Sequence, residues 1–169
     1  MATTLTSFFL LAFRSCLQPS SPHSGAIVEE MAVDAHRGNG TGANKADQTY
    51  AVSLTVDSTG TNVNLRSLTD ALGTALAPAE VVDFGWQADR DNTAAVNITA
   101  TETSGGAADP WLAFLVASGD GVKLPPGCTL AFAGGPDGSL PLTASSRGLK
   151  FAAASGSQVI RLLFTFRSV

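Results

Sequence analysis

Residues 50–56 alternate between apolar and small or polar side chains, which is the pattern of a strand with one buried face. A turn-forming Asp-Ser-Thr-Gly segment follows at 57–60, and further apolar runs separated by Gly, Pro, Asp and Asn continue to the C-terminus. The run at 111–117 is apolar throughout, as expected for a strand covered on both faces. The pattern predicts strands at residues 50–56, 80–86, 94–101, 111–117, 122–124, 128–133, 148–154 and 158–167.

Residues 65–76 depart from this alternation. Leucine recurs there at helical spacing, Asn64 precedes the segment as a candidate N-terminal cap, and Pro78 follows it. We therefore predict one short helix over residues 65–76.

The spacing of the predicted strands indicates the fold class. Short strands at intervals of 8–14 residues are typical of β-sandwiches and jelly rolls. A chain of 169 residues is about the size of one domain. We expect an all-β fold, a jelly-roll-like antiparallel β-sandwich over residues 49–169 with one short helix, preceded by an extended N-terminal arm over residues 1–48.

The first residues contain an apolar run that resembles an export signal. No positive charge precedes it, since Arg14 follows the run, and its length is far below the roughly 20 residues that span a bilayer. We expect an uncleaved arm rather than a signal peptide or a transmembrane anchor. The rest of the arm is rich in Pro, Ser, Gly and Asn and cannot bury enough surface to fold alone. The arm is therefore expected to bind another subunit through its apolar residues, which are Leu5, Phe8, Phe9, Leu10, Leu11, Phe13, Ile27 and Val28.

Composition narrows the function classes. Apolar residues make up 44% of the chain and charged residues only 14%, so much of the surface is suited to contact with neighbouring proteins. The net charge is −4 and no basic stripe is present, which argues against nucleic acid as a partner. Residues 49–169 contain no histidine, and His23 and His36 both lie in the arm. A hydrolytic Ser-His triad on a rigid scaffold is therefore not expected, and we predict no enzymatic activity and no cofactor.

Several acidic residues are candidates for a calcium site or for a catalytic carboxylate pair. The loop Asp89-Arg90-Asp91-Asn92 offers oxygen ligands for calcium, but it lacks a glycine-containing ligand loop and a distal glutamate, so we favour a solvated turn. Asp83 with Asp89, or Asp120 with Asp137, would be a carboxylate pair for glycoside hydrolysis only if the fold brought them together.

The cysteines and aromatic residues have both structural and functional interpretations. Cys16 and Cys128 share no metal or redox spacing; they are candidates for a disulfide, although one buried and one free thiol is the interpretation we favour. Trp86, Trp111 and Tyr50 are candidates for stacking on a sugar, but aromatic residues in alternating strands are more often part of the core.

The C-terminal third resembles a known group of proteins. The stretch 122–132 with its Pro-Pro-Gly turn, the small-residue strand at 149–156 and the apolar strand at 159–166 are similar to the closing strands of decoration (cement) proteins on tailed-bacteriophage heads. The resemblance implies a β-sandwich whose last strands form hairpins. It also implies rings, often trimers, on a capsid surface that are held partly by N-terminal arms.

Two function classes remain after these exclusions. The first is a virion structural protein, specifically a capsid decoration protein that binds and stabilises the shell through its arm and its oligomer contacts. Its partners would be the major capsid protein or other virion subunits and further copies of itself, with a trimer favoured, and neither nucleic acid nor membrane. The alternative is a carbohydrate-binding or adhesin-like module.

Overall fold

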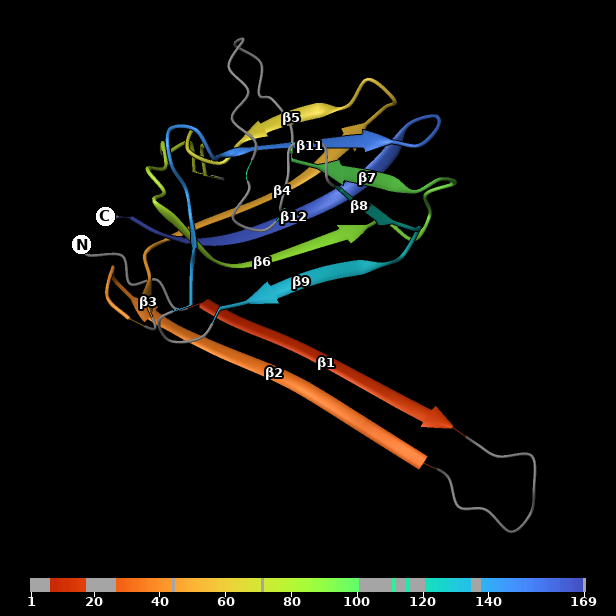
Figure 1. Ribbon diagram of the computed structural model, residues 1–169, viewed down its shortest axis with the longest axis horizontal. Helices are drawn as coiled ribbons and strands as arrows, with labels where there is room; N and C mark the ends of the chain where they lie inside the picture. Colours follow the sequence, from red (N-terminus) through yellow and green to blue (C-terminus); the bar gives the residue numbers. More distant parts are fainter. Residues whose placement is uncertain are drawn as a thin grey trace.

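The computed structural model describes residues 7–17, 27–43, 45–70, 72–100, 111, 115, 121–134 and 138–168, and in this part of the chain every regular element is a strand. Three strands form the N-terminal unit, and the others belong to two larger sheets (Figure 1). The strands are β1 (Ser7–Leu17), β2 (Ile27–Asn39), β3 (Lys45–Ala46), β4 (Gln48–Val56), β5 (Thr61–Asn64), β6 (Glu80–Ala88), β7 (Val96–Thr99), β8 (Gly121–Leu124), β9 (Thr129–Ala133), β10 (Leu140–Pro141), β11 (Gly148–Ala153) and β12 (Gln158–Arg167).

The two larger sheets form a sandwich, as the sequence predicted. Sheet I has the order β10-β6-β12-β4, with β9 also paired to β6, and sheet II has the order β5-β11-β7-β8. All ladders within these two sheets are antiparallel. The jelly-roll connection of the strands stays a prediction.

Alternation along the strands builds the core between the sheets. On β12 the side chains of Ile160, Leu162, Phe164 and Phe166 are buried, whereas Arg161 and Leu163 between them are exposed. The register places this buried row opposite the apolar rows of β4 and β6 on the same face of sheet I.

Aromatic side chains join the two layers at the centre of this core. Phe164 lies between Trp86, with ring centroids 6.1 Å apart, and Phe166, with centroids 5.5 Å apart. Trp86 on sheet I meets Phe151 on sheet II edge to face, with centroids 5.9 Å apart. The sandwich therefore closes over one continuous aromatic cluster.

The predicted turn at residues 57–60 is confirmed. The Asp57 carboxylate accepts hydrogen bonds from the backbone N–H groups of Thr59, at 2.8 Å, and Gly60, at 3.0 Å. These two hydrogen bonds hold the pKa of Asp57 below its usual value, and the bond from Gly60 has the larger effect. Gly60 has a φ of +80°, and a Cβ there would lie 2.9 Å from the Phe151 carbonyl oxygen, so the turn requires glycine.

The helix predicted over residues 65–76 is wrong. The described residues of this segment form turns, with an isolated bridge between Thr69 and Ala75. Asp70 accepts hydrogen bonds from the N–H groups of Leu72 and Thr74, and Gly73 has a φ of +84°. These local bonds compete with a helical ladder, and Leu72 is left 90% exposed.

Most of the predicted strand at 111–117 lies outside the described residues; Trp111 and Leu115 are described, and neither belongs to a strand. An expectation from the resemblance needs correction. The closing hairpins implied by the resemblance are absent from the described strands: β8 and β9 lie in different sheets, as do β11 and β12. The chain therefore crosses from one sheet to the other between β8 and β9 and between β11 and β12, and each of these strands pairs with a strand from another part of the sequence.

Phe164 provides a direct test of this core. We expect Phe164→Ala to lower the free energy of unfolding by about 3–5 kcal/mol, because it removes a fully buried ring and leaves a cavity. The matched control, Leu72→Ala, removes an exposed side chain and should change it by less than about 0.5 kcal/mol. Urea denaturation followed by tryptophan fluorescence measures both, and equal effects would contradict the assigned core.

Candidate interaction site: the N-terminal ribbon

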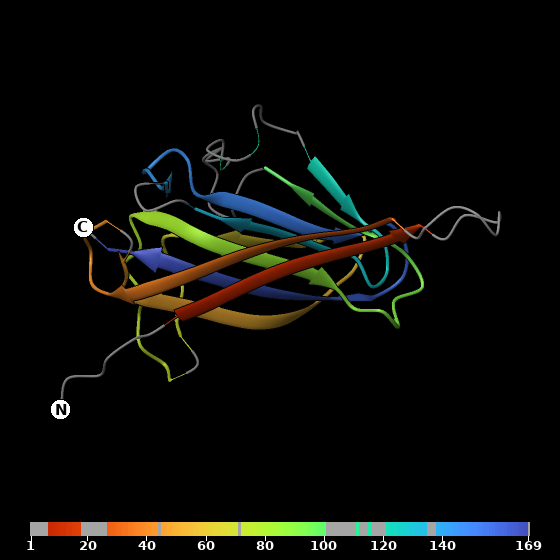
Figure 2. The ribbon, with the colours of Figure 1, turned by 90° about the horizontal axis from the view of Figure 1, so that it is seen from below.

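The expected extended arm is a long two-stranded ribbon. β1 and β2 pair antiparallel without interruption from Ser7 opposite Arg37 to Leu17 opposite Ile27. We refer to these two strands as the N-terminal ribbon; they run side by side over their whole length (Figures 1 and 2). The division into an arm over residues 1–48 and a domain over 49–169 stays a prediction.

The register sorts the ribbon positions into two faces, since directly opposed residues share a face and successive pairs alternate. One face carries apolar residues at four of its six pairs, and the opposite face is mixed, with Arg14 opposite Glu30 and Leu10 opposite Asp34. The apolar pairs of the first face are Phe9 with Ala35, Leu11 with Val33, Phe13 with Met31, and Leu17 with Ile27.

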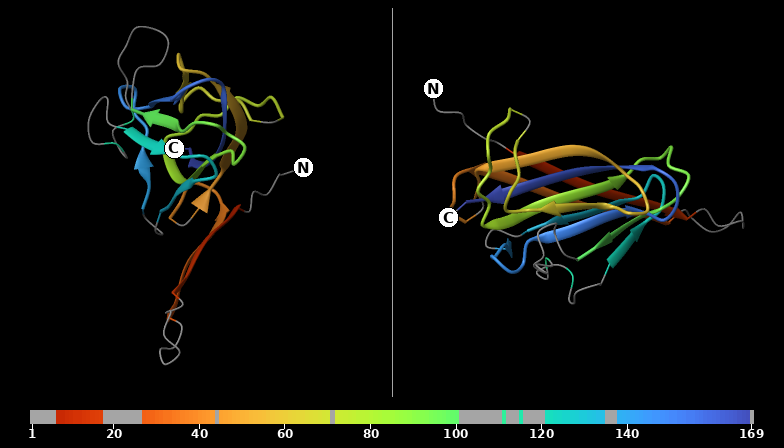
Figure 3. Two further views of the ribbon diagram at one scale, coloured as in Figure 1. Left: turned by 90° about the vertical axis from the view of Figure 1, so that its right-hand side faces the viewer. Right: turned by 90° about the horizontal axis from the view of Figure 1, so that it is seen from above.

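The ribbon joins the sandwich at its base only. β2 continues into a two-residue parallel pairing of Gly38 and Asn39 with β3, and beyond this point the ribbon extends away from the sandwich (Figure 3, left). Arg167 anchors the base: its side chain bonds the Glu80 carboxylate at 2.6 Å and the Gly42 carbonyl oxygen at 2.9 Å. Ser168 adds hydrogen bonds to the Asp47 carboxylate.

A two-stranded ribbon is not expected to be stable without further contacts. An isolated two-stranded hairpin is marginally stable in water, and its stability increases when a third strand or another surface covers it. Among the described strands, the ladder that joins the ribbon to the rest of the chain is the two-residue pairing of β2 with β3 at its base. The ribbon therefore has the geometry of a segment that is completed by a partner.

Most of the residues predicted for the arm site lie on this ribbon. Phe8, Phe9, Leu10, Leu11 and Phe13 belong to β1, and Ile27 and Val28 to β2. Leu5 lies outside the described residues. Met31 and Val33 belong to a short apolar patch of the sequence at residues 26–33, but the predicted site leaves them out, together with Ala35. The period-2 spacing of these three residues on β2 would have indicated a strand.

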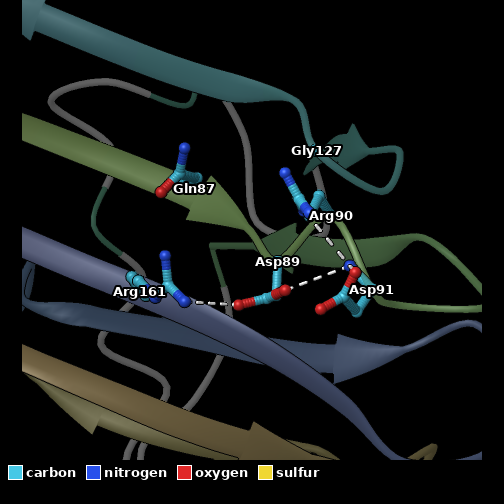
Figure 4. A pocket seen from close by; sticks show the side chains of 6 residues that line it. All are labelled: Gln87, Asp89, Arg90, Asp91, Gly127 and Arg161. Atoms are coloured by element: carbon cyan, nitrogen blue, oxygen red, sulfur yellow. Dashed lines mark hydrogen bonds and ion pairs between the residues drawn. The ribbon is translucent and has the colours of Figure 1, made fainter.

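A second candidate, the loop after β6, contains the residues considered for calcium. A polar pocket of about 350 Å³ lies at this point. Figure 4 shows Asp89 and Arg161 in its lining, pointing toward one another. The carboxylate of Asp89 bonds Arg161 at 2.6 Å and accepts the backbone N–H of Asp91 at 3.0 Å. The pocket is lined by Gln87, Asp89, Arg90, Asp91, Gly127 and Arg161.

Asn92 completes this turn rather than a cation site. Its side chain donates to the Val159 carbonyl oxygen at 2.8 Å and accepts the Val159 N–H at 2.7 Å. Both polar atoms of the amide are thereby used to attach the loop to β12. In the described residues no group of three or more acidic, His or Cys side chains is arranged to hold a metal ion.

The carboxylate pair Asp83 and Asp89 is ruled out by strand geometry. The two residues are six positions apart along β6 and its end, which corresponds to about 20 Å at 3.3 Å per residue, well beyond a glycosidase pair. Asp83 is buried and accepts hydrogen bonds from the Thr165 hydroxyl at 2.8 Å and the Gly134 N–H at 3.2 Å. Asp120 and Asp137 lie outside the described residues.

The aromatic residues considered for sugar binding belong mainly to the core. Trp86 and Trp111 are both 0% exposed, and Tyr50 is half-buried at the edge of sheet I, where this burial raises its pKa. Neither tryptophan presents a face for a sugar. Cys128 is a free and exposed thiol, and the side chain of Cys16 is not described.

Comparison with known proteins gives no relative to guide the assignment: no family model, curated protein or solved structure matches the chain. Among the described residues, no helix combines the length and the apolar character needed to cross a bilayer.

Asn92 tests the structural role of the loop after β6. We expect Asn92→Ala to lower the free energy of unfolding by about 1–3 kcal/mol, because it removes two hydrogen bonds to the Val159 backbone. Arg161→Ala removes the partly exposed ion pair with Asp89 and should cost less than about 1 kcal/mol. Urea titrations measure both changes in the free energy of unfolding. A larger loss for Arg161→Ala than for Asn92→Ala would show that the ion pair, and not the amide, holds the loop.

Proposed function

We propose that this protein is a structural subunit of a virus particle, a capsid decoration protein that binds and stabilises the shell. The observation that carries the proposal is the N-terminal ribbon, a long hairpin with an apolar face that leaves the sandwich at a single anchored point. A ribbon of this kind is suited to lie across a neighbouring subunit.

Burial of the apolar face provides the driving force for assembly. The four apolar pairs of that face include Phe9, Leu11 and Phe13, and each such side chain contributes about 1.5–3 kcal/mol when it is fully buried. The charged residues of this face are Arg37 and Glu29, which are paired with Ser7 and Ser15 on either side of the three successive apolar pairs from Phe9 to Phe13. Docking of these three pairs therefore buries no charged residue of the same face.

The virion assignment rests in addition on the sequence resemblance of residues 122–132, 149–156 and 159–166 to head decoration proteins, although the closing hairpins that this resemblance implies are not formed by the described strands. These stretches include most of β8, most of β9, most of β11 and the apolar part of β12, all within the sandwich. In this proposal the sandwich projects from the shell, and the ribbons tie copies to one another and to the major capsid protein, with a trimer as the favoured oligomer.

Removal of the ribbon tests its role in assembly. We expect the full chain to form a defined oligomer, and a chain starting at Gly38 to be a monomer with an unchanged β-rich circular dichroism spectrum, because the buried core identified here lies between Ala46 and Phe166. Light scattering after size exclusion gives the masses. An oligomer that survives the truncation, or a monomeric full chain, would contradict the proposal.

The virion assignment has its own test. In purified particles of the virus that encodes this sequence, quantitative mass spectrometry should find the protein in a fixed ratio to the major capsid protein. Particles from which the protein is missing would refute a structural role in the virion, whatever its oligomeric state.

A further inference from the structure

Hydrogen bonding within sheet I determines which backbone groups of β4 remain open. Val159 accepts a backbone hydrogen bond from Asp89 at 3.0 Å, so this residue of β12 directs its polar groups toward β6. Because successive residues of a strand direct their N–H and C=O groups to opposite sides, the even residues of β12 bond to β4.

The same alternation continues across the β12–β4 ladder. Leu162 is paired with Val52 and Ile160 with Leu54, so these residues of β4 direct their backbone groups to β12. The residues between them, Ala51, Ser53 and Thr55, direct theirs away from the sheet. We refer to this side of β4 as the open edge, since β12 is the only strand paired with β4 in the described part of the chain.

The open edge lacks the features by which proteins protect edge strands. β4 has nine residues, Gln48–Val56, with no charge, no proline and no glycine, and its ladder with β12 has no bulge. The other outer strands of the sandwich are shorter: β5 and β8 have four residues each and β9 has five. A long unprotected edge is a site at which another strand can pair.

Side-chain burial at the edge is also incomplete. Tyr50, Val52 and Leu54 pack against the core but are only half-buried, whereas their register partners on β12 are fully buried. On the outer face, Leu163 is 38% exposed and lies opposite Ala51 in the register. An added strand with apolar residues on both faces would lie beside this inner row and, on the outer face, beside Ala51.

β1 of the ribbon matches these requirements. It has eleven residues, pairs with β2 on one side only among the described strands, and carries apolar residues in alternate positions on both faces, Phe9 and Leu11 on one and Phe8 and Leu10 on the other. The ribbon of the same chain extends away from its own sandwich (Figures 1 and 3), so the open edge is available to the ribbon of another copy.

We propose that β1 of one copy pairs with the open edge of β4 in a second copy, so that sheet I continues into the ribbon of its neighbour. This inference rests on the proposed self-assembly and specifies its contact. Each copy then donates one ribbon and accepts one, an arrangement that forms a ring when the rotation between copies closes.

A proline at the open edge tests the contact, because it removes an outward N–H without removing a bond of the β12–β4 ladder. We expect full-length Ser53→Pro to keep the circular dichroism spectrum of the wild type and to lose the oligomer. Ser53→Ala retains the N–H and should assemble. Val52→Pro, with the opposite backbone direction, should instead unfold the edge of the sandwich.

Two variants with complementary defects identify the strand that docks. Ser53→Pro retains the ribbon but has no accepting edge, whereas the double variant Leu11→Asp, Phe13→Asp retains the edge but disrupts the apolar face of the ribbon. Each alone should be monomeric. Mixed in equal amounts, they should form a heterodimer, which native mass spectrometry resolves after one variant is labelled with ¹⁵N.

The outcomes separate this inference from the proposed function. If removal of the ribbon abolishes the oligomer but Ser53→Pro does not, the ribbon docks elsewhere and only the inference is overturned. If Ser53→Pro abolishes the oligomer but ribbon removal does not, copies pair through β4 alone, and both proposals fail. Should Ser53→Pro not fold, Ser53→Lys introduces an edge-protecting charge with the backbone intact, and full assembly of that variant would overturn the inference.

Discussion

The sandwich depends on the two-sided pairing of β12. This ten-residue strand bonds to β6 on one side and β4 on the other, and its buried row from Ile160 to Phe166 forms the centre of the core. Because the backbone groups of a strand alternate in direction, the ladder with β6 also determines how β4 is bonded. The open edge of β4 is a direct consequence of the pairing that stabilises the domain.

The protein combines this open edge with a ribbon in which β1 pairs with β2 alone among the described strands. Both features favour association with another chain, because unpaired backbone groups of an edge strand are a site at which a further strand can pair. The base of the ribbon is fixed to the C-terminal end of β12 through Arg167 and Ser168. A ribbon that docks on a neighbour would therefore be attached directly to the central strand of its own sandwich.

The sequence predicted those parts of the structure that depend on local periodicity. Strands such as β4 and β12 show clear alternation, and the Asp57 turn has its own residue signature. The helix prediction failed because leucine spacing was given more weight than Asp70 and Gly73, whose local conformations end a helix. β2 was missed because acidic residues interrupt its apolar positions. The open edge could not be predicted, because it depends on which strands are neighbours, and β4 and β12 are about 100 residues apart in the sequence.

Amide hydrogen exchange, resolved by residue in the assembled protein, is the most direct measurement of the proposed contact. If β1 of a neighbour pairs with the open edge, the N–H groups of Ala51, Ser53 and Thr55 are hydrogen-bonded and exchange as slowly as those of Val52 and Leu54. If the edge stays unpaired in the assembly, protection alternates along β4, with slow exchange at Val52 and Leu54 and rapid exchange at the residues between and beside them. The alternating result would contradict strand addition at β4.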